Sequence, residues 1–580
     1  MVHGYFKGNR GLWHGDPLSS YLFVIAMNIL SIMLNNAADD LRIKYHHKCS
    51  SSRLTHLCFA DDLLIFIDGS IDSVQNVLQV LKEFELRSGL AVTVQKSCFF
   101  ASGLIQQEVD SIKASTGMPN GLLPVRYLGV PLCTKKLTLS NCEVLIQQVK
   151  AKFNSWTVKT LSFAGRLLLI KTVIAGITNF WCSNFLLHKA CIAKINSLCG
   201  IFLWKGSIEG NHTARVSWET VTKSREGGGL GIKDLGTWNK ACCLKLIWML
   251  FFQGGSVWVA WFKTEILNGN LSNYWTVNTS PSNTWLANKL IKLRGEVYTW
   301  IRLRVGNGVN CRFWIDNWSS LGSLKDYFAA NASSRQGIPL IATLSDLNRA
   351  GDWNIPQPRS EAMLQAQIAL TTISLVEEED NYEWVVTGVP TGRYKTSLIY
   401  CKLKGEKQMV PWAKIVWTKG GIPKHNFLTW LFVLDRCPTR DRLRSWGLPV
   451  DSKCLLCNLE DETRDHLYFR CSFSWRVLSE MARRCSIVPS QLWSDTINQL
   501  ISLQGNKLLK RLVHLSWQGV IYSLWRERNQ RLHNRHFQTS DTIIATINRQ
   551  IKDKILSFRT SSPSLSSSLM QMWVMTEASS

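Results

Sequence analysis

The pattern of apolar and polar positions predicts a helix, a hairpin and a second helix near the start of the chain. Apolar side chains form a broad continuous face over residues 18–36, which indicates a buried helix. Two short apolar runs flank an acidic turn within residues 54–67, the pattern of two short strands. A second helix is predicted over residues 71–87 and ends at Ser88-Gly89, because glycine is favoured in the left-handed C-cap conformation. A turn and a strand at residues 123–132 close this first unit.

The pattern changes several times downstream, and the changes predict a multidomain α+β protein. Residues 138–205 are mainly helical in pattern, and a Trp-rich stretch with Gly, Asn and Ser turns follows them. A Ser-rich stretch at 561–568 is predicted to be disordered. The predicted domains are an α/β unit of a helix plus a β-hairpin (1–135), a helical region (136–210), a Trp-rich connector (211–392), a small α-rich module with clustered Cys and His (393–480), a basic helical region (481–560) and a disordered tail (561–580).

Length and composition agree with several globular domains, and the net charge favours one class of partner. Single cores rarely grow past roughly 250 to 300 residues, so a chain of 580 residues contains more than one. The 25 tryptophans are spread from Trp13 to Trp573, which indicates core and stacking residues of several domains. The formal charge of +25 favours a polyanionic partner such as nucleic acid; an anionic membrane or simple solubility are the alternatives.

The cysteines and the longest apolar stretches indicate an intracellular protein without membrane spans. Seventeen cysteines, odd in number and irregular in spacing, do not form the pattern of a disulfide framework, and residues 1–11 lack a signal-peptide pattern. We therefore expect a reducing compartment, the nucleus or the cytoplasm, and no secretion. Polar residues interrupt the apolar stretches 18–34 and 246–262, and both fall short of about 20 apolar residues, so we predict buried helices there.

Two adjacent carboxylates, Asp61 and Asp62, lie between apolar runs at the predicted hairpin. Adjacent acids repel each other and resist desolvation, so a bound divalent cation would explain them, and so would a solvent-exposed turn. The same dipeptide at Asp39-Asp40 ends a helical pattern beside polar residues, where a solvated helix end explains it fully. Local physics leaves both explanations of Asp61-Asp62 open.

A glycine-bounded loop, Arg10-Gly11-Leu12-Trp13-His14-Gly15-Asp16-Pro17, precedes this hairpin and opens the first helix. The loop followed by Phe59-Ala60-Asp61-Asp62, in this order and spacing, resembles the palm of non-LTR retrotransposon reverse transcriptases. Further on, Ser88-Gly89-Leu90 leading to Lys96-Ser97 is similar to the next palm motif of that family. Residues 125–132 are similar to its primer-grip strand, so residues 1–135 would be a partial palm and residues 136–210 a thumb-like region.

The resemblance implies two-metal nucleotidyl transfer on RNA, single-stranded DNA or an RNA–DNA hybrid. Asp61 and Asp62 would bind Mg²⁺, and Lys96 would lie near the incoming triphosphate. His14 stands where the family usually has Gln, and Ser20 stands where it usually has Pro. The nucleotide and template contacts implied by the resemblance are Gly11, His14, Gly15, Asp16 and Pro17.

One expected carboxylate is missing from the part of the chain before this loop. The family's third carboxylate lies on a strand upstream of the glycine-bounded loop, and residues 1–10 contain no Asp or Glu. Without one bridging carboxylate a two-metal site loses both charge and geometry. We therefore expect a truncated polymerase by descent that is inactive as this chain alone.

Three cysteines and a histidine have the spacing Cys-x2-Cys-x8-His-x4-Cys and can hold one Zn²⁺. They are Cys454, Cys457, His466 and Cys471; the alternative is three buried cysteines and a capping histidine. Four protein ligands leave no place for water, so the zinc would be structural. The surrounding residues, from Trp417-Thr418-Lys419-Gly420 through Phe427 and Trp430 to Cys437-Pro438-Thr439-Arg440, resemble the zinc-binding module of plant retrotransposon reverse transcriptases.

Three functional hypotheses follow: an active RNA-directed DNA polymerase, an inactive nucleic-acid-binding protein, and a zinc-stabilised protein-interaction module. Basic and aromatic residues of the zinc module suit nucleic acid, although each Trp is equally well explained as core. The basic C-terminal helices favour nucleic acid as well. Their recurring basic residues are Lys507, Lys510, Arg511, Arg526, Arg528, Arg531 and Arg535.

Overall fold

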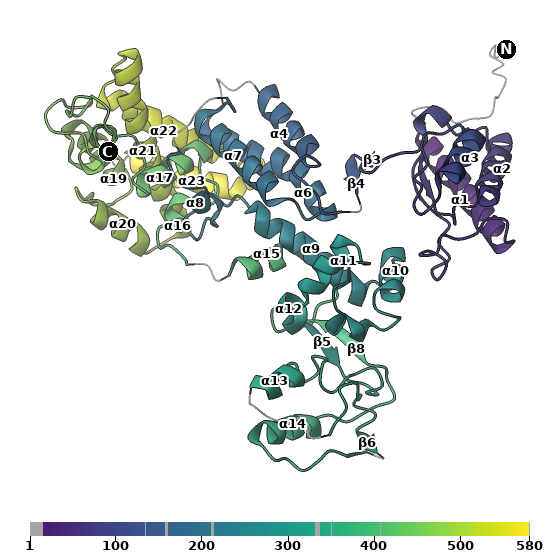
Figure 1. Cartoon of the computed structure of the whole chain (residues 1–580). Helices are drawn as coiled ribbons and strands as arrows, with labels where there is room; N and C mark the ends of the chain where they lie inside the picture. Colours follow the sequence, from purple (N-terminus) through teal and green to yellow (C-terminus); the bar gives the residue numbers. More distant parts are fainter. Residues whose placement is uncertain are drawn as a thin grey trace, which may run out of the picture. The chain divides into compact units, whose positions relative to one another are not determined.

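The computed structural model (Figure 1) describes residues 16–133, 135–156, 161–209, 214–330, 337–349, 351–405 and 408–578. The chain is mostly helical with four small two-stranded antiparallel sheets among the described residues, as the α+β multidomain prediction requires. It divides into two compact units. The first comprises Met1–Asn141, Ser183–Leu186 and Lys240–Tyr400, and the second comprises Cys142–Cys182, Leu187–Asn239 and Cys401–Ser580.

The first unit begins with the predicted order of helix, hairpin and helix. It contains α1 (Pro17–Asp39), β1 (His56–Phe59), β2 (Asp62–Ile65) and α2 (Ile71–Ser88). The side chain of Asp16 caps α1, and Gly89 ends α2 in the left-handed conformation with φ 76°, as predicted. Apolar residues of α1 and α2 form a shared core with Ile43, which follows α1; the core residues are Leu30, Leu34, Ala37, Ile43, Val77, Val80 and Phe84.

The strand predicted at residues 123–132 is a hairpin of two short strands. The elements after α2 are η1 (Val94–Lys96), α3 (Gln106–Thr116), β3 (Val125–Tyr127) and β4 (Val130–Leu132). The turn Leu128-Gly129 has positive φ values of 49° and 80°, which allows β4 to pair back on β3.

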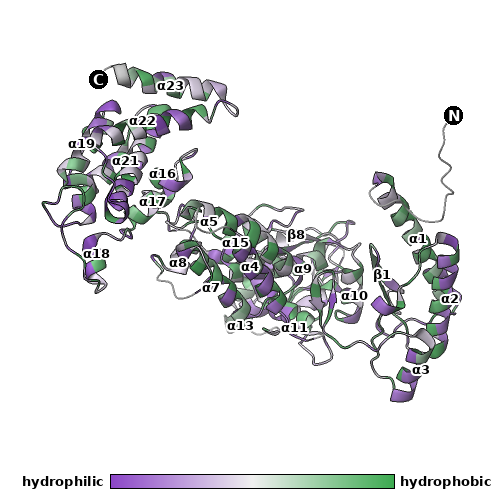
Figure 2. Cartoon of the chain, turned by 90° about the horizontal axis from the view of Figure 1, so that it is seen from above, coloured by the Kyte–Doolittle hydropathy of each residue, from purple (hydrophilic) through white to green (hydrophobic). Residues whose placement is uncertain are grey.

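The prediction that residues 18–34 form a buried helix is correct for the helix and wrong for the burial. Only the C-terminal half of α1 packs into the core; Tyr21 is 71% and Val24 66% exposed. Figure 2 shows apolar residues along much of this helix. By length and composition, α1 and the segment Phe163–Asn184 could each cross a membrane, and so could the helix pair Leu235–Phe252 and Val257–Glu265, which is bent by 79°.

The remaining part of the first unit is a Trp-rich assembly around a small sheet. The strands β5 (Ile301–Arg304) and β8 (Asn381–Trp384) pair antiparallel, with Ile301 opposite Trp384. The Asp380 carboxylate accepts hydrogen bonds from the backbone N–H groups of Gly306, Gly308 and Asn310, which fixes the turn at residues 306–310. The other elements are α9 (Leu235–Phe252), α10 (Val257–Glu265), η4 (Leu271–Trp275), α11 (Trp285–Lys292), α12 (Arg294–Val297), η5 (Tyr298–Trp300), α13 (Leu324–Ala330), β6 (Asn348–Arg349), β7 (Asp352–Trp353), α14 (Glu361–Thr371) and α15 (Thr396–Lys404).

The second unit is helical and contains the cysteine and histidine cluster. Its long helix α21 (Lys507–Asn534) packs against four other helices, α17 (Pro423–Val433), α19 (Ser472–Arg484), α22 (Ser540–Leu556) and α23 (Pro563–Ala578). The glycine loop at residues 227–229 approaches other backbone closely: a Cβ on Gly229 would lie 2.3 Å from the Lys223 carbonyl oxygen. The other elements are α4 (Glu143–Ser155), α5 (Phe163–Leu169), the π-helical turn η3 (Ile170–Ile174), α6 (Ala175–Asn184), α7 (Lys189–Lys205), α8 (Trp218–Thr222), α16 (Ala413–Val416), α18 (Arg440–Ser445), η6 (His466–Arg470) and α20 (Trp493–Ser502).

The predicted disordered tail is wrong, because residues 563–578 form helix α23. Leu569 and Trp573 are fully buried, and Trp573 Nε1 donates to Asn548 Oδ1 of α22 at 2.7 Å. Ser566 is also buried and donates to the Ile555 carbonyl oxygen. The helix is stable because its apolar residues cover α22, although its serine content is that of a linker.

Candidate metal centre and acidic turn

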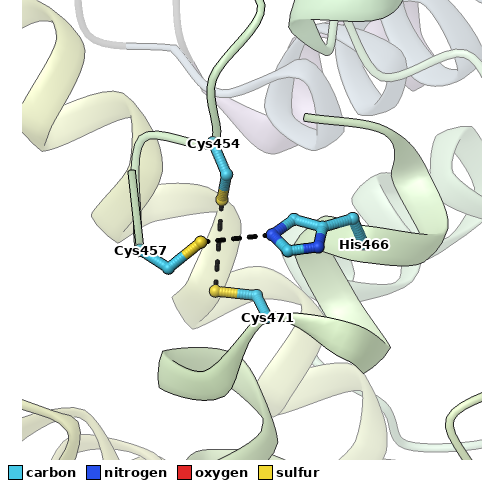
Figure 3. Close-up of side chains that lie close together, drawn as sticks. All are labelled: Cys454, Cys457, His466 and Cys471. Atoms are coloured by element: carbon cyan, nitrogen blue, oxygen red, sulfur yellow. Dashed lines mark hydrogen bonds between the residues drawn. The ribbon is translucent and has the colours of Figure 1, made fainter. Parts of the chain in front are cut away.

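Four side chains from one short stretch point toward one another and form the candidate metal centre (Figure 3). They are Cys454, Cys457, His466 and Cys471, and their ligand atoms all lie within 4.8 Å of one another. The Sγ atoms of Cys454 and Cys471 are 4.0 Å apart, and Cys457 Sγ lies 3.2 Å from His466 Nε2. With Zn–S bonds of about 2.3 Å and Zn–N bonds of about 2.0 Å, tetrahedral ligands lie roughly 3.5 to 3.8 Å apart. The donor set and its spacing therefore fit one zinc ion.

A tight backbone turn positions the first two cysteines. The N–H of Cys454 donates to the Glu460 carbonyl oxygen at 2.7 Å, and the N–H of Asn458 donates to the Cys454 carbonyl oxygen at 2.8 Å. Asn458 has φ 57°, a left-handed conformation that Asn adopts more readily than most residues. The N–H of Leu456 points at Cys454 Sγ at 3.4 Å and favours its thiolate form.

The other two ligands lie at the two ends of a π-helical turn, η6. His466 begins this turn, and Cys471 follows it as the N-cap of α19. A hydrogen bond from Cys454 Sγ, together with the backbone N–H groups of Ser474 and Phe473, lowers the pKa of Cys471 to about 5. A thiolate at a helix N-terminus is stabilised in the same sense by the helix dipole.

A carboxylate outside the ligand set orients the histidine. His466 Nδ1 lies 3.0 Å from Glu460 Oε2, so Nε2 is the nitrogen that faces the three sulfur atoms. Such carboxylate–histidine contacts fix the tautomer of a metal-binding imidazole and raise its basicity.

A buried ion pair connects the cysteine turn to α21. Arg528 Nη2 donates to Glu462 Oε1 at 2.8 Å, and both side chains are almost fully buried. Glu462 also accepts from the backbone N–H of Arg440 at 3.0 Å. Arg531 donates to the carbonyl oxygens of Leu455 and Leu456 between the first two ligands, at 3.3 and 2.8 Å. The cysteine turn is therefore held from outside by two arginines of one helix.

The acidic pair lies at the tip of the β1–β2 hairpin and is exposed. Phe59 pairs with Asp62, and Ala60 takes a positive φ of 52° in the turn. Burial and then the Asp62 carboxylate raise the pKa of Tyr127, so the β3 side chain lies within electrostatic reach of the acidic turn. Carboxylates of this kind fit as two of the ligands of a hard cation such as Mg²⁺. Among the residues that the structure describes, no third His, Cys or carboxylate group completes a site with them.

The other residues assigned by resemblance remain largely predictions. Gly11, His14 and Gly15 lie outside the described residues. Asp16 accepts a hydrogen bond from the N–H of Leu18 at 2.9 Å and Pro17 is the first residue of α1, so in this structure both have capping roles. Lys96 ends η1 and is exposed.

One sequence-based expectation about the nucleic-acid surface needs correction, and one alternative that the sequence left open is decided. Arg528 and Arg531 belong to the packing around the cysteine turn, so they do not extend a basic surface of α21. Phe427 and Trp430 of the zinc module are buried, which confirms the explanation of these aromatics as core.

Sequence reasoning missed the residues that surround the metal ligands. Glu460 lies in the acidic turn after Cys457, where its distance in sequence from His466 is short enough to have suggested the contact. Arg528 is 66 residues from Glu462, and no local pattern connects the two.

Comparisons with known proteins identify two segments of the chain. Residues 3–132 match the family described as "Reverse transcriptase (RNA-dependent DNA polymerase)", and residues 394–477 match "zinc-binding in reverse transcriptase". A putative ribonuclease H protein of Arabidopsis thaliana is 29% identical over 193 residues, which are 33% of this chain and 31% of that protein. An uncharacterized mitochondrial protein of the same plant is 26% identical over 137 residues, 23% of this chain and 88% of that protein. A second one is 40% identical over 60 residues, 10% of this chain and 49% of that protein.

The two family matches fall on the two sites just described. The first contains the hairpin with Asp61 and Asp62, and the second contains the four metal ligands. The chain therefore contains a segment similar to reverse transcriptases at residues 3–132 and a segment similar to the zinc-binding domain of reverse transcriptases at residues 394–477.

Proposed function

We propose that this chain is the C-terminal part of a plant non-LTR, LINE-type reverse transcriptase that binds RNA, single-stranded DNA or an RNA–DNA hybrid. The observation that carries the proposal is the β1–β2 hairpin, which exposes two adjacent carboxylates at its tip with Tyr127 beside them. An exposed pair of acids next to an aromatic hydroxyl suits a site that receives cations and a nucleotide from solvent. The order of the polymerase segment and the zinc domain along one chain supports the same function.

Asp61 and Asp62 would hold the Mg²⁺ ions, which lower the pKa of the primer 3′-hydroxyl and stabilise the leaving oxygen when bound. Lys96, exposed at the end of η1, would attract the triphosphate of the incoming nucleotide. Tyr127 keeps its proton at neutral pH, as a tyrosine ordinarily does, and burial raises its pKa further, so its hydroxyl can donate a hydrogen bond beside the acidic turn.

The 580 residues by themselves contain two of the three expected carboxylates of this site, and we propose that they do not extend a primer alone. The test is primer extension on an RNA template with Mg²⁺ or Mn²⁺, using the chain and its Asp61→Ala variant. Both proteins are expected to give background incorporation, because two carboxylates supply too little charge and geometry for two metal ions. Incorporation by the unchanged chain that disappears in Asp61→Ala would show that the site works.

The zinc domain would have a structural role within this protein, since four protein ligands leave no open position for a substrate. The competing proposal is a zinc-stabilised protein-interaction module. The affinity of the chain for nucleic acid over a salt series separates the two, because phosphate contacts release counterions and an uncharged protein surface does not.

We also propose an intracellular location, in the nucleus or the cytoplasm. The supporting observation is that Cys454, Cys457 and Cys471 converge with His466 as zinc ligands, which requires thiols that stay reduced.

A further inference from the structure

A cavity of about 430 Å³ lies in the second unit, far along the sequence from the acidic turn and the zinc centre. Its walls come from the segment of η3 and α6, from α7, from α8 and from residues 231–238. Small-molecule sites usually have volumes of roughly 300 to 1,000 Å³, so the cavity can hold one nucleotide-sized group. A π-helical turn forms one wall, and such turns occur frequently at functional sites.

The charges around this cavity are positive. Two lysines, Lys171 and Lys233, are among the lining residues, and the lining residues include no Asp or Glu. Lys171 is largely buried and donates to the Leu230 carbonyl oxygen. Burial, and then the neighbouring cation Arg225, lower its pKa to about 8. Among the described residues Lys171 has no ion pair, so an anion entering the cavity would meet an uncompensated ammonium group.

The remaining lining residues offer aromatic surface and a hydrogen-bond donor. Trp218 lines the cavity, and its Nε1 is buried without a hydrogen-bond partner. Leaving a buried donor unpaired is unfavourable, and an acceptor atom of a ligand would remove that cost. Trp238 also lines the cavity; its ring face carries Lys233 Nζ at 3.2 Å from the centroid, and its Nε1 donates to Asn179. Lys233 is thereby held at the wall.

We propose that this cavity holds one nucleotide of a single-stranded nucleic acid, with a phosphate at Lys171 and Lys233 and the base against Trp218. A strand fits better than a duplex, because the cavity admits one nucleotide-sized group and its aromatic wall can stack only an unpaired base. The inference rests on the proposed nucleic-acid binding and assigns that binding to a particular place on the chain.

The test measures binding of a fluorescent single-stranded 12-nucleotide DNA to the full chain by anisotropy, at several salt concentrations. Lys171→Met removes the charge while keeping an unbranched side chain. Gly176→Leu fills the cavity without changing any charge: a Cβ on Gly176, which lines the cavity, meets no atom within 4 Å, and leucine favours the helix over glycine. Lys194→Ala is the matched control, since Lys194 is exposed on α7 and is not a lining residue.

Lys171→Met is expected to weaken binding about tenfold and to lower the log–log salt slope by ~0.7, the contribution of one phosphate contact on a single strand. Gly176→Leu should weaken binding similarly with a smaller change in slope, and Lys194→Ala should stay within about twofold of the unchanged chain. If Lys171→Met fails to fold, Gly176→Leu carries the test. Binding by both cavity variants that equals the control would overturn the inference and leave nucleic-acid binding in place.

A second measurement needs no variant. Acylation of lysines in the unchanged chain, read by mass spectrometry, should show Lys171 protected by the single strand while Lys194 stays reactive. Equal labelling of Lys171 with and without the strand would contradict the assignment. Complete displacement of the strand by an equal concentration of free dTTP would identify a mononucleotide site instead of a strand site. Absence of any binding by the unchanged chain at low salt would overturn both this inference and the proposed function.

Discussion

At the scale of single residues, the metal centre depends on four side chains, and all four come from one short stretch of the chain, residues 454–471. Cys457 is the least buried of the four, so its removal disturbs the surrounding core least. Cys457→Ser is expected to abolish tight zinc binding, because structural zinc in small modules contributes on the order of 10 kcal/mol and three ligands hold it poorly. Zinc content after gel filtration measures this.

The matched control is Cys401→Ser, which replaces an exposed cysteine on α15 that is not a ligand. It should retain one zinc per chain. A full zinc content in Cys457→Ser would contradict the ligand assignment.

A buried histidine in the same unit predicts a pH dependence of stability. His425 stacks on Tyr522, has no hydrogen-bond partner on either ring nitrogen, and burial followed by Lys424 lowers its pKa to about 3. Between pH 6.5 and 3 the unfolded chain therefore binds a proton that the folded chain does not. Stability is fully present above about pH 6.5 and falls as the pH is lowered, by about 2 kcal/mol from this group at pH 5.

His425→Phe keeps the aromatic stacking and removes the titration. Urea unfolding at pH 7 and pH 5 should show a smaller loss of stability in the variant than in the unchanged chain. Part of the loss will remain, because burial also lowers the pKa of His514, to about 4. An identical pH dependence in both proteins would contradict the role of His425.

The ligands could be predicted from the sequence because their chemistry and spacing are local, and the groups around them could not. The Cys-x2-Cys spacing sets the geometry of a turn within a few residues. The partner of the buried Glu462 is 66 residues away, and its identity depends on how α21 packs. A pattern of basic residues cannot distinguish a solvated arginine from one that compensates a buried acid.

At the scale of elements, α23 shows how packing overrides composition. Its serine-rich sequence has the composition of a disordered tail, yet Leu569 and Trp573 are completely buried. Trp573→Ala is expected to destabilise the second unit by about 3 to 5 kcal/mol, because it removes a large buried side chain and leaves a cavity. Circular dichroism during urea unfolding measures the change.

The exposed Val574, next to Trp573 on the same helix, provides the control. Val574→Ala should change stability by less than about 0.5 kcal/mol. If α23 contributes nothing to the free energy of unfolding, both variants will give the same unfolding curve, and the prediction is wrong.

Among the elements, the hairpin and its flanking helices were predictable because caps and turn residues determine them locally. Gly89 ends α2 where the pattern places it. The extent to which α1 is buried was not predictable. An apolar face indicates that other residues can pack on a helix, but it does not indicate which residues do so or along how much of its length. The same holds for the hairpin at residues 125–132, where only the pairing of β3 with β4 shows that two strands are present.

At the scale of the whole molecule, the charge of +25 predicts binding to single-stranded RNA or DNA with little sequence preference. Each neutralised phosphate contributes ~0.7 to the log–log salt slope, so five contacts change the affinity more than tenfold between low and moderate salt. Filter binding over a salt series measures the slope. A flat dependence would favour the protein-interaction module.

The basic residues of α21 allow the same prediction to be tested at a single exposed residue. Arg526 is exposed, whereas Arg528 is buried against Glu462. Arg526→Glu is therefore expected to lower the slope if α21 faces nucleic acid, while leaving zinc content unchanged.

The buried pair of Glu462 and Arg528 has a consequence for the order in which the protein can be completed during synthesis. The ribosome adds roughly 5 to 20 residues per second, so the 66 residues that separate the two take roughly 3 to 13 s. Once Cys471 has been added, nine residues after Glu462, all four zinc ligands exist for the rest of that interval, but the carboxylate beside them has no arginine. Since burying an unpaired carboxylate is strongly unfavourable, the newly made cysteine turn must stay open to water until α21 arrives. Zinc can therefore be captured early but enclosed only late, and any agent that competes for zinc or oxidises thiols has its best opportunity in those seconds.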